Sequence, residues 1–333
     1  MTHNPFGRLP VQDFIAIGDL QADELKRLLA TAIEIKANRA AYKDLLAGKR
    51  IAMLFEKESL RTRVTFDIGI QELGGSAVFL DLRDQRMGSR ESVRDMAKNL
   101  ERWVDGIIAR TFRHRTVMDL AKNASIPVIN GLTDLLHPCQ ALADTLTLTE
   151  RWGSVEGRKI VFVGDGNNTC HSLMMACAKL GADFLAVSPE GYEPNLKVMN
   201  QALAAAKLSG ATIDYTDEIE DSVRGADAIY TDVWASMGQE DEVEERSGVF
   251  ADYQVDDEMM ALAKPDAVFM HCLPAHRGQE VTASVMDGPQ SIVFDIAENR
   301  LHAQKAVMAM LMGAGESAQR TPAFDLDAVE VQA

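Results

Sequence analysis

The stretch FEKESLRTRVTF places hydroxyl and guanidinium side chains directly after the apolar run IAMLF. Ser59, Arg61, Thr62 and Arg63 gather there in a chain whose formal net charge is −16. Ser59 is a good N-cap candidate, so the first N–H groups of the next helix would point outward beside a guanidinium fork and two hydroxyls. This is the chemistry of an anion site, although a solvated helix start with scattered charges would give the same pattern if this stretch stood alone.

The two arginines of this stretch are expected to have different roles. Arg61 and Arg63 are two positions apart, and side chains at that spacing do not share a helix face. We therefore expect Arg61 to face the ligand and Arg63 to form a structural ion pair.

Further polar clusters follow other apolar runs that read as strands. These clusters are Arg110 after DGIIA, His137 and Gln140 after VINGLTDLL, Asp232 to Met237 after DAIYT, and His271 to Pro274 after DAVF. Taken singly, Cys272 is typical of a small core residue, His137 of a helix cap and Asp232 of a turn. Their joint position favours a functional site, because open α/β sheets bind ligands at the carboxyl ends of their strands.

The segment GDGNN, from Gly164 to Asn168, resembles the start of a dinucleotide fingerprint. The third glycine and an acidic partner for the ribose are missing, so a simple tight turn is the better interpretation. A dinucleotide-dependent oxidoreductase is therefore a rival hypothesis, which absence of nicotinamide binding would exclude.

The elements that must position these residues alternate between strands and helices, which is typical of α/β folds with parallel sheets. Strands are expected at IAMLF, GGSAVFLDL, VDGIIAR, SIPVING, KIVFVG, ADFLAVSP, ATIDYTD, ADAIYTDVW, DAVFMHCLP and SIVFDIA. Helices are expected at DELKRLLATAIEIKANRAAYKDLL, SVRDMAKNLERW, TVMDLAKNA, HPCQALADTLTLTERWG and ENRLHAQKAVMAMLMG.

Length and composition limit the classes of function. A chain of 333 residues, 47% of them hydrophobic, favours two domains. No apolar run approaches the ~20 residues of a membrane span and no signal peptide is recognisable, so a cytoplasmic location is the expectation. The four cysteines lack CxxC spacing, which predicts free thiols and no metal site. An excess of 50 acidic over 34 basic residues argues against nucleic acid or a membrane as partner.

Several long motifs resemble those of the ornithine carbamoyltransferases, within the aspartate/ornithine transcarbamylase superfamily. FEKESLRTR is similar to the family's carbamoyl-phosphate motif, HPCQALAD to its second signature and DVWASMGQE to its amino-acid loop. HCLPAHRGQEV and FDIAENR are similar to its C-terminal signatures. The resemblance covers roughly residues 8 to 315, with the motifs in the family's order.

The resemblance implies an α/β fold of two domains, each a parallel β-sheet flanked by helices, joined by interdomain helices. Residues 1–136 would bind carbamoyl phosphate, with a helix at 299–315 returning to that domain. Residues 137–152 would form a connecting helix and 153–298 the ornithine-binding domain. The tail 316–333 has weak apolar periodicity and is expected to be partly disordered. A homotrimer or higher multiple, with each site near a subunit boundary, is also implied.

The resemblance also assigns site residues. Carbamoyl phosphate would be bound by Ser59, Leu60, Arg61, Thr62, Arg110, His137, Gln140, Arg300 and the backbone carbonyls of Cys272 and Leu273. Ornithine would be bound by Asn168, Asp232, Ser236 and Met237. The catalytic groups would be Arg110, His137, Thr62, Asp232 and Cys272. No metal and no cofactor is implied.

The implied reaction is attack of the δ-amine of L-ornithine on carbamoyl phosphate, which gives L-citrulline and phosphate in the direction of arginine biosynthesis. The second position of the phosphate motif departs from the family, because Leu60 replaces threonine and removes a hydroxyl donor. Arg86, on a loop that would reach the neighbouring subunit's site, is a candidate compensator or else an exposed loop charge.

Three alternatives stay open. Leucine at the second motif position also occurs in relatives that carbamoylate N-acylornithine, and putrescine is another possible amine. Those relatives lack the SMG loop, which is present here as Ser236, Met237 and Gly238 within DVWASMGQE and favours ornithine. A non-catalytic protein of the same fold would have lost site residues, whereas only Leu60 departs within these motifs.

Overall fold

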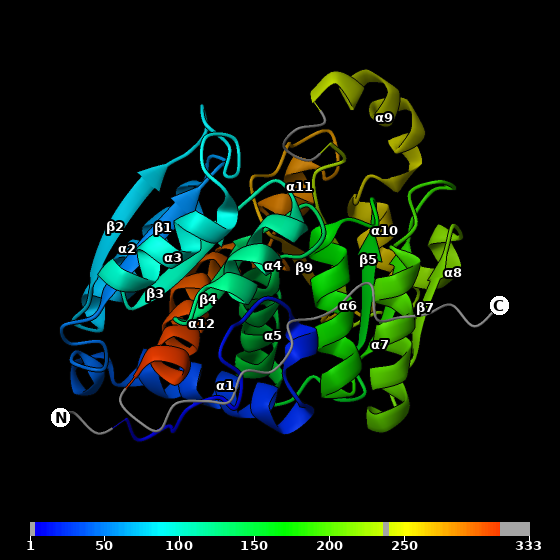
Figure 1. Ribbon diagram of the computed structural model, residues 1–333. Helices are drawn as coiled ribbons and strands as arrows, with labels where there is room; N and C mark the ends of the chain where they lie inside the picture. Colours follow the sequence, from blue (N-terminus) through cyan, green and yellow to red (C-terminus); the bar gives the residue numbers. More distant parts are fainter. Residues whose placement is uncertain (1–3, 236–239, 314–333) are drawn as a thin grey trace. The chain divides into compact units, whose positions relative to one another are not determined.

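Two parallel β-sheets organise the chain, each built from strands that alternate with helices (Figure 1). The computed structural model describes residues 4–235 and 240–313. These residues divide into one unit formed by 4–146 and 299–313 and a second formed by 147–298. Helices α5 (Pro138–Trp152) and α12 (Val293–Met312) each run from one unit into the other. The fold class predicted from sequence is confirmed.

The first unit contains a four-stranded sheet in the order β2-β1-β3-β4, with every neighbouring pair parallel. In chain order, the strands and α-helices of this unit are α1 (Ala22–Ala37), β1 (Arg50–Phe55), α2 (Leu60–Glu72), β2 (Ser76–Asp81), α3 (Val93–Trp103), β3 (Gly106–Arg110), α4 (His114–Asn123) and β4 (Val128–Leu132), together with most of α5 and α12. Phe55 pairs with Arg110, so the ends of β1 and β3 lie side by side. The loops that follow both strands therefore emerge at one edge of the sheet.

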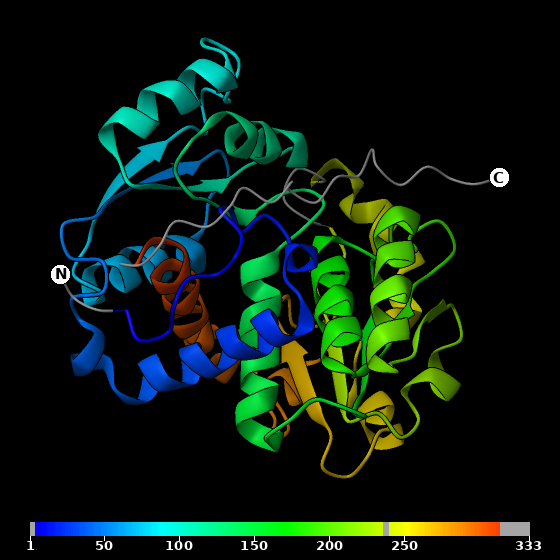
Figure 2. The same cartoon turned by 60° about the horizontal axis from the view of Figure 1, so that its bottom comes forward.

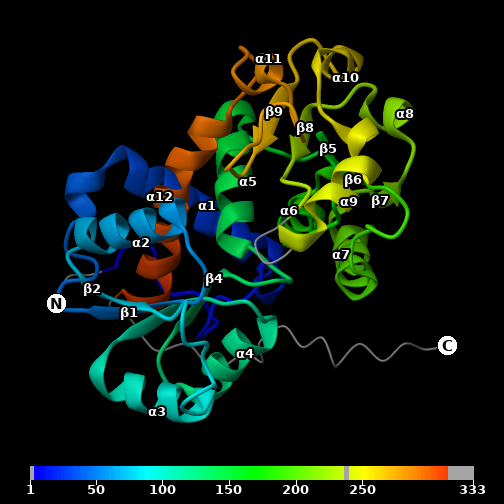
Figure 3. The ribbon, with the colours of Figure 1, turned by 90° about the horizontal axis from the view of Figure 1, so that it is seen from above.

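Helices cover both faces of this sheet. Figure 3 shows α3 and α4 on one face and α1, α2 and α12 on the other. Alternating strand residues such as Ala52, Leu54 and Ile107 pack with Leu100 of α3 and Leu120 of α4 in one buried cluster. The strand period of two sends the intervening apolar residues to the opposite face, which explains why β1 is apolar almost throughout.

Helix α12 is bound through polar contacts to α1 and to the 3₁₀ turn Arg39–Tyr42 that follows it. Figure 2 shows α1 lying beside α12. Lys36 Nζ donates to Asn299 Oδ1 at 2.9 Å, and Arg39 Nη2 lies 3.1 Å from His302 Nε2. The last helix of the described chain is thus attached to the region of its first helix.

The second unit contains a five-stranded parallel sheet in the order β7-β6-β5-β8-β9. Its elements are β5 (Lys159–Val163), α6 (Asn168–Leu180), β6 (Asp183–Val187), α7 (Leu196–Ser209), β7 (Ile213–Thr216), α8 (Ile219–Val223), β8 (Ala228–Thr231), α9 (Val243–Val249), α10 (Asp257–Leu262), β9 (Val268–His271) and α11 (Ala283–Met286). Strand β8 lies between β5 and β9, and Thr231 pairs with both Val163 and His271. The ends of three strands are therefore adjacent.

Two expected elements differ from the structure. The segment SIVFDIA is not a strand, because only Ser291 forms an isolated bridge, to Phe269, and helix α12 already begins at Val293. A short apolar run cannot be assigned to strand or helix by periodicity alone. The first helix ends at Ala37, and a short 3₁₀ turn, Arg39–Tyr42, replaces its expected last part.

No helix within residues 4–235 and 240–313 is long and apolar enough to cross a bilayer.

His114 is expected to make the fold sensitive to acid. Its ring is buried with Nδ1 3.0 Å from Thr133 Oγ1, and burial lowers the pKa of His114 to about 4. Between pH 6.5 and 4.5 the unfolded chain binds a proton that the folded chain does not. The free energy of unfolding should therefore fall by roughly 2–3 kcal/mol from this residue as the pH decreases.

Urea unfolding of His114→Gln at these two pH values would test this, with the exposed His276→Gln as control. The wild-type chain and the control should lose the same stability, and His114→Gln should lose less. An unchanged pH dependence in His114→Gln would contradict the assignment.

Candidate active site

Ser59 is the N-cap of α2, as the sequence predicts. Its Oγ accepts a hydrogen bond from the backbone N–H of Thr62 at 3.1 Å. Backbone amides in the first turn of a helix are exposed at its N-terminal end, so this helix start is suited to binding an anion. Leu60 is 73% exposed, so the residue that departs from the motif presents an apolar surface at this helix start.

Thr62 brings two distant guanidinium groups together. Its Oγ1 accepts from Arg300 Nη2 at 2.9 Å and from Arg110 Nη1 at 3.4 Å, and all three residues are buried. Arg300 Nη1 also donates to Gln140 Oε1 at 2.6 Å. Since a hydroxyl accepts two bonds and donates one, the Thr62 proton remains for a ligand. The structure thus assembles a cationic cluster from four separate elements.

His137 lies buried beside this cluster. Burial, followed by the charges of Arg300, Arg110 and Arg61, lowers the pKa of His137 well below its ordinary value. The imidazole is therefore neutral at physiological pH and can offer one N–H donor without adding charge. A neutral donor polarises a carbonyl oxygen without trapping it as an ion pair.

Glu56 is a site residue that the sequence analysis missed. Its carboxylate accepts from the backbone N–H of Met87 at 2.7 Å and of Phe112 at 2.9 Å, and its own N–H donates to Arg110 O at 2.9 Å. It holds the loop after β2 and the loop after β3 against the end of β1. The only sequence feature that could have indicated a role for Glu56 is its position within FEKESLRTR.

Arg63 does not form the expected ion pair among the described residues. Its guanidinium instead lies over the ring of Phe79, with Cζ 3.8 Å from the ring centroid. This is a cation–π interaction with an aromatic residue of β2, and residue spacing within the helix could not predict it. Arg86 behaves similarly, with its Cζ 4.2 Å from the Phe112 centroid of its own chain.

In the second unit, Asp232 lies directly beyond the end of β8. Cys272 Sγ donates to its Oδ1 at 3.0 Å, and Asn167 Nδ2 donates to its Oδ2 at 2.9 Å. Asn167 also caps α6, and Asn168 is the first residue of that helix. Ser236 and Met237, which were expected to bind the same ligand, lie outside the described residues.

Arg246 was not identified from the sequence either. It donates to Asp165 Oδ2 at 2.9 Å, to Trp234 O at 2.8 Å and to Glu242 Oε2 at 2.7 Å. Burial raises the pKa of Asp165 to about 6, and the charge of Arg246 opposes that rise. One guanidinium thus fixes the GDGNN turn and the chain segments that lead into and out of residues 236–239.

The GDGNN segment is a tight turn in the structure. A side chain at Gly166 would place its Cβ only 2.3 Å from Pro194 N, so the close approach of two backbones explains that glycine. Asp165 forms an ion pair with Arg246, and Asn167 donates a hydrogen bond to Asp232. Both side chains of the turn therefore interact with other residues of the protein.

His271 supports the loop after β9. Its Nδ1 accepts from Leu273 N at 2.8 Å, and its Nε2 faces Glu280 Oε1 at 3.3 Å. Leu273 has φ 59°, a left-handed conformation that costs roughly 1–3 kcal/mol for a non-glycine residue. Fixed contacts on both sides of the imidazole maintain this conformation.

One donor set could hold a metal ion. Asp232, His271 and Cys272 place an oxygen, a nitrogen and a sulfur within 4.8 Å of one another, which are ligand types that Zn²⁺ accepts. Both ring nitrogens of His271 already face protein groups, so ligation would require the ring to leave its position.

The predicted residues therefore fall into two groups. Ser59, Leu60, Arg61, Thr62, Arg110, His137, Gln140 and Arg300 belong to the first unit. Asn168, Asp232, Cys272 and Leu273 belong to the second. The first group can bind a dianion and polarise a carbonyl group, and the second offers a carboxylate and a thiol suited to an ammonium group.

Comparisons with known proteins also find two parts in the chain. Residues 12–150 match the aspartate/ornithine carbamoyltransferase carbamoyl-P binding domain, and residues 156–311 match the Asp/Orn binding domain. The chain is 52% identical over 304 residues to an ornithine carbamoyltransferase of Thermococcus kodakarensis, covering 91% of this chain and 96% of the relative. An anabolic ornithine carbamoyltransferase of Pyrococcus furiosus is 51% identical, with the same coverage.

The solved structure of ornithine carbamoyltransferase from Pyrococcus furiosus is also similar. It superposes with a TM-score of 0.89 at 50% identity, covering 92% of this chain and 98% of that structure.

Substitution of Ser59 by alanine should separate capping from anion binding. Loss of either N-cap serine, Ser59 or Ser92, should cost about 1 kcal/mol of stability, because each accepts one bond from a first-turn amide. Only Ser59→Ala should also weaken binding of inorganic phosphate, measured by calorimetry. Equal phosphate affinity in Ser59→Ala and Ser92→Ala would contradict an anion site at α2.

Proposed function

Because the chain belongs to the aspartate/ornithine carbamoyltransferase family, we propose that it transfers the carbamoyl group of carbamoyl phosphate to the δ-amine of L-ornithine. The products are L-citrulline and phosphate. The observation that carries the proposal is the convergence of Arg110 and Arg300 on the hydroxyl of Thr62, next to the neutral His137.

The phosphate of the first substrate binds at the start of α2. Helix amides, the Ser59 and Thr62 hydroxyls and the guanidinium groups of Arg61 and Arg110 offset its two negative charges. The same groups stabilise phosphate as it leaves, so they lower the barrier to cleavage of the carbonyl–phosphate bond. Leu60 contributes only its backbone N–H.

The carbamoyl group is oriented by the buried part of the cluster. Thr62, Arg110 and His137 donate toward its oxygen, on which negative charge develops as the tetrahedral intermediate forms. Gln140 orients the amide end, and Arg300 holds Gln140 and Thr62 in place at 2.6 Å and 2.9 Å. No covalent bond to the protein is required.

Ornithine binds to the second unit. The carboxylate of Asp232 accepts the α-ammonium group, and Asn168, Ser236 and Met237 complete the set of groups that bind the amino acid. The δ-amine must be neutral to attack, although a free alkylamine is largely protonated at pH 7. Cys272, whose thiol is 3.0 Å from Asp232, is the group assigned to assist in removing that proton.

The biosynthetic direction is part of the proposal, supported by the relative whose name describes it as anabolic. Ornithine is preferred over N-acylornithine and putrescine because the SMG segment is present and Asp232 can pair with an unmodified ammonium group. A cytoplasmic location fits the four free thiols at Cys139, Cys170, Cys177 and Cys272.

A homotrimer or a higher multiple is also part of the proposal. Leu60, Val64 and Ile68 form an exposed apolar stripe along α2, at the spacing of one helix face. Val78 and Leu80 are exposed on the neighbouring edge strand β2. Exposed apolar side chains on the helix and on the edge strand favour contact with a second copy of the chain.

The reaction is tested by measuring ureido-product formation from carbamoyl phosphate with ornithine, N-acetylornithine, N-succinylornithine, putrescine and aspartate in separate assays. Ornithine should be used best, and Arg110→Ala should lower its turnover by roughly 10²–10³-fold while the protein stays folded. The exposed Arg151→Ala is the control. Turnover of another amine instead of ornithine, or near-normal turnover in Arg110→Ala, would overturn the assignment.

Arg86 is proposed to compensate for Leu60 by reaching the carbamoyl phosphate of a neighbouring subunit. Arg86→Gln should then raise the Michaelis constant for carbamoyl phosphate by roughly tenfold, because one charge-assisted hydrogen bond is worth about 1.5–3 kcal/mol. Arg90→Gln, exposed on the same loop, should leave it unchanged. If Arg86→Gln also leaves it unchanged, Arg86 is only a loop charge.

A further inference from the structure

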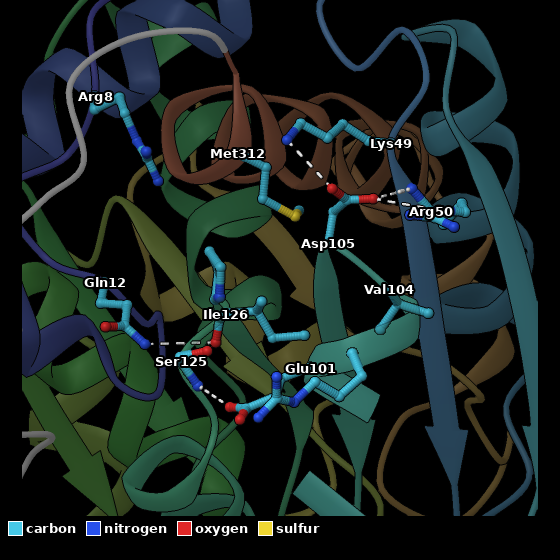
Figure 4. Close-up of a pocket in the computed structure, with 12 residues that line it drawn as sticks. Arg8, Gln12, Lys49, Arg50, Glu101, Val104, Asp105, Ser125, Ile126 and Met312 are labelled. Carbon is cyan, nitrogen blue, oxygen red and sulfur yellow. Dashed lines mark hydrogen bonds and ion pairs between the residues drawn. The ribbon is translucent and has the colours of Figure 1, made fainter. Parts of the chain in front are cut away.

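A second polar cavity lies in the first unit, at the opposite edge of the sheet from Ser59 and Arg110. Its volume is about 400 Å³. Arg50 at the start of β1 and Pro127 just before β4 line it, so it opens at the amino ends of the strands. Figure 4 shows the cavity. None of its lining residues has a role in the proposed reaction.

Cations exceed carboxylates in this cavity. Four cationic side chains and two carboxylates line it: Arg8, Lys49, Arg50, Arg102, Glu101 and Asp105. Asp105 is already engaged, because its carboxylate lies 3.4 Å from Lys49 Nζ and 3.6 Å from Arg50 Nε and accepts from Arg50 N at 2.9 Å (Figure 4).

Glu101 is engaged as well. Its Oε2 accepts from Ser125 N at 2.7 Å, and its Oε1 lies 3.3 Å from Lys98 Nζ outside the cavity lining. These contacts lower the pKa of Glu101, with the Ser125 amide as the largest cause. Both carboxylates therefore have other cations or amides as partners, which leaves the charges of Arg8 and Arg102 without a carboxylate among the residues described.

Arg8 gives the strongest indication of an anion. Its Nη2 donates to the carbonyl of Leu311, while its Nε is buried and has no hydrogen-bond partner within residues 4–235 and 240–313. Burial, without a nearby carboxylate to oppose it, lowers the pKa of Arg8. A partly buried guanidinium without a nearby carboxylate is costly unless a ligand supplies negative charge. In Figure 4 its side chain extends into the cavity from the N-terminal segment.

We propose that this cavity is a binding site for a small doubly charged anion, whose charge is balanced by the surplus positive charge of Arg8 and Arg102. The guanidinium forks match the paired oxygens of a phosphate group or a carboxylate. The side chains of Val104, Ile126 and Met312 form an apolar wall, which can pack against the uncharged part of such a ligand. Neither the phosphate motif nor the proposed reaction requires this site.

The site is tested by isothermal titration of inorganic phosphate, and separately of malonate, at low ionic strength, where charge screening is weak. The proteins compared are the wild-type chain, Arg61→Gln, Arg8→Gln and the double variant. The wild-type chain should bind phosphate at two sites. Arg61→Gln should retain the cavity site, Arg8→Gln should weaken that site at least about tenfold, and the double variant should bind at neither.

Three further variants distinguish a loss of binding from a loss of folding. Arg102→Gln should weaken the same site, Arg8→Lys should keep a measurable part of the affinity, and the exposed Arg115→Gln should change nothing. The better of the two probes in the Arg61→Gln protein identifies whether a phosphate or a dicarboxylate is preferred.

Equal binding by Arg61→Gln and the double variant would overturn the proposal. So would a single site in the wild-type chain that Arg61→Gln abolishes, whether the cavity stays empty or is filled by the chain's own residues 314–333, which lie outside the described residues. By contrast, two phosphate sites in Arg61→Gln would contradict the role of Arg61 in the proposed function and leave the cavity site standing.

Discussion

The first unit depends on one hydroxyl group that accepts hydrogen bonds from two buried guanidinium groups. Arg110 and Arg300 would repel each other if they were held together in water, and burial removes the solvent that normally screens such repulsion. Thr62 offsets part of this cost by accepting from both. In the function proposed above, binding of a dianion offsets more of this cost, which would couple substrate binding to the stability of the unit.

His137 completes this cluster, and its protonation state follows from its burial and from the nearby arginines. Burial, together with the charges of Arg300, Arg110 and Arg61, lowers the pKa of His137, so its imidazole is neutral and can donate one hydrogen bond. The carboxylate of Glu56 accepts hydrogen bonds from the backbone amides of two loops and so holds both loops beside the end of β1.

Much of this arrangement could be predicted from the sequence, and the limits have physical causes. Alternating apolar runs indicated parallel sheets, and Ser59 followed by Arg61 and Thr62 indicated an anion site, because strand period and helix capping are local properties. Arg63 of helix α2 was misassigned because the group it contacts is an aromatic ring on strand β2. Glu56 and Arg246 were missed because their partners are mainly backbone atoms or residues far along the chain, which no local pattern records. The start of α12 was misplaced because SIVF is too short to distinguish strand from helix.

The position of Arg300 on α12 has a consequence for biosynthesis. Arg300 follows Arg110 by 190 residues, with the whole second unit between them. At about 5–20 residues per second, translation needs roughly 10–40 seconds to proceed from one to the other. During that interval the nascent first sheet carries Arg110 and Thr62 without the helix that later covers them. The chain must therefore nearly finish synthesis before the first unit can close its core around these charges, and a nascent chain halted before α12 would present an incomplete sheet face to chaperones.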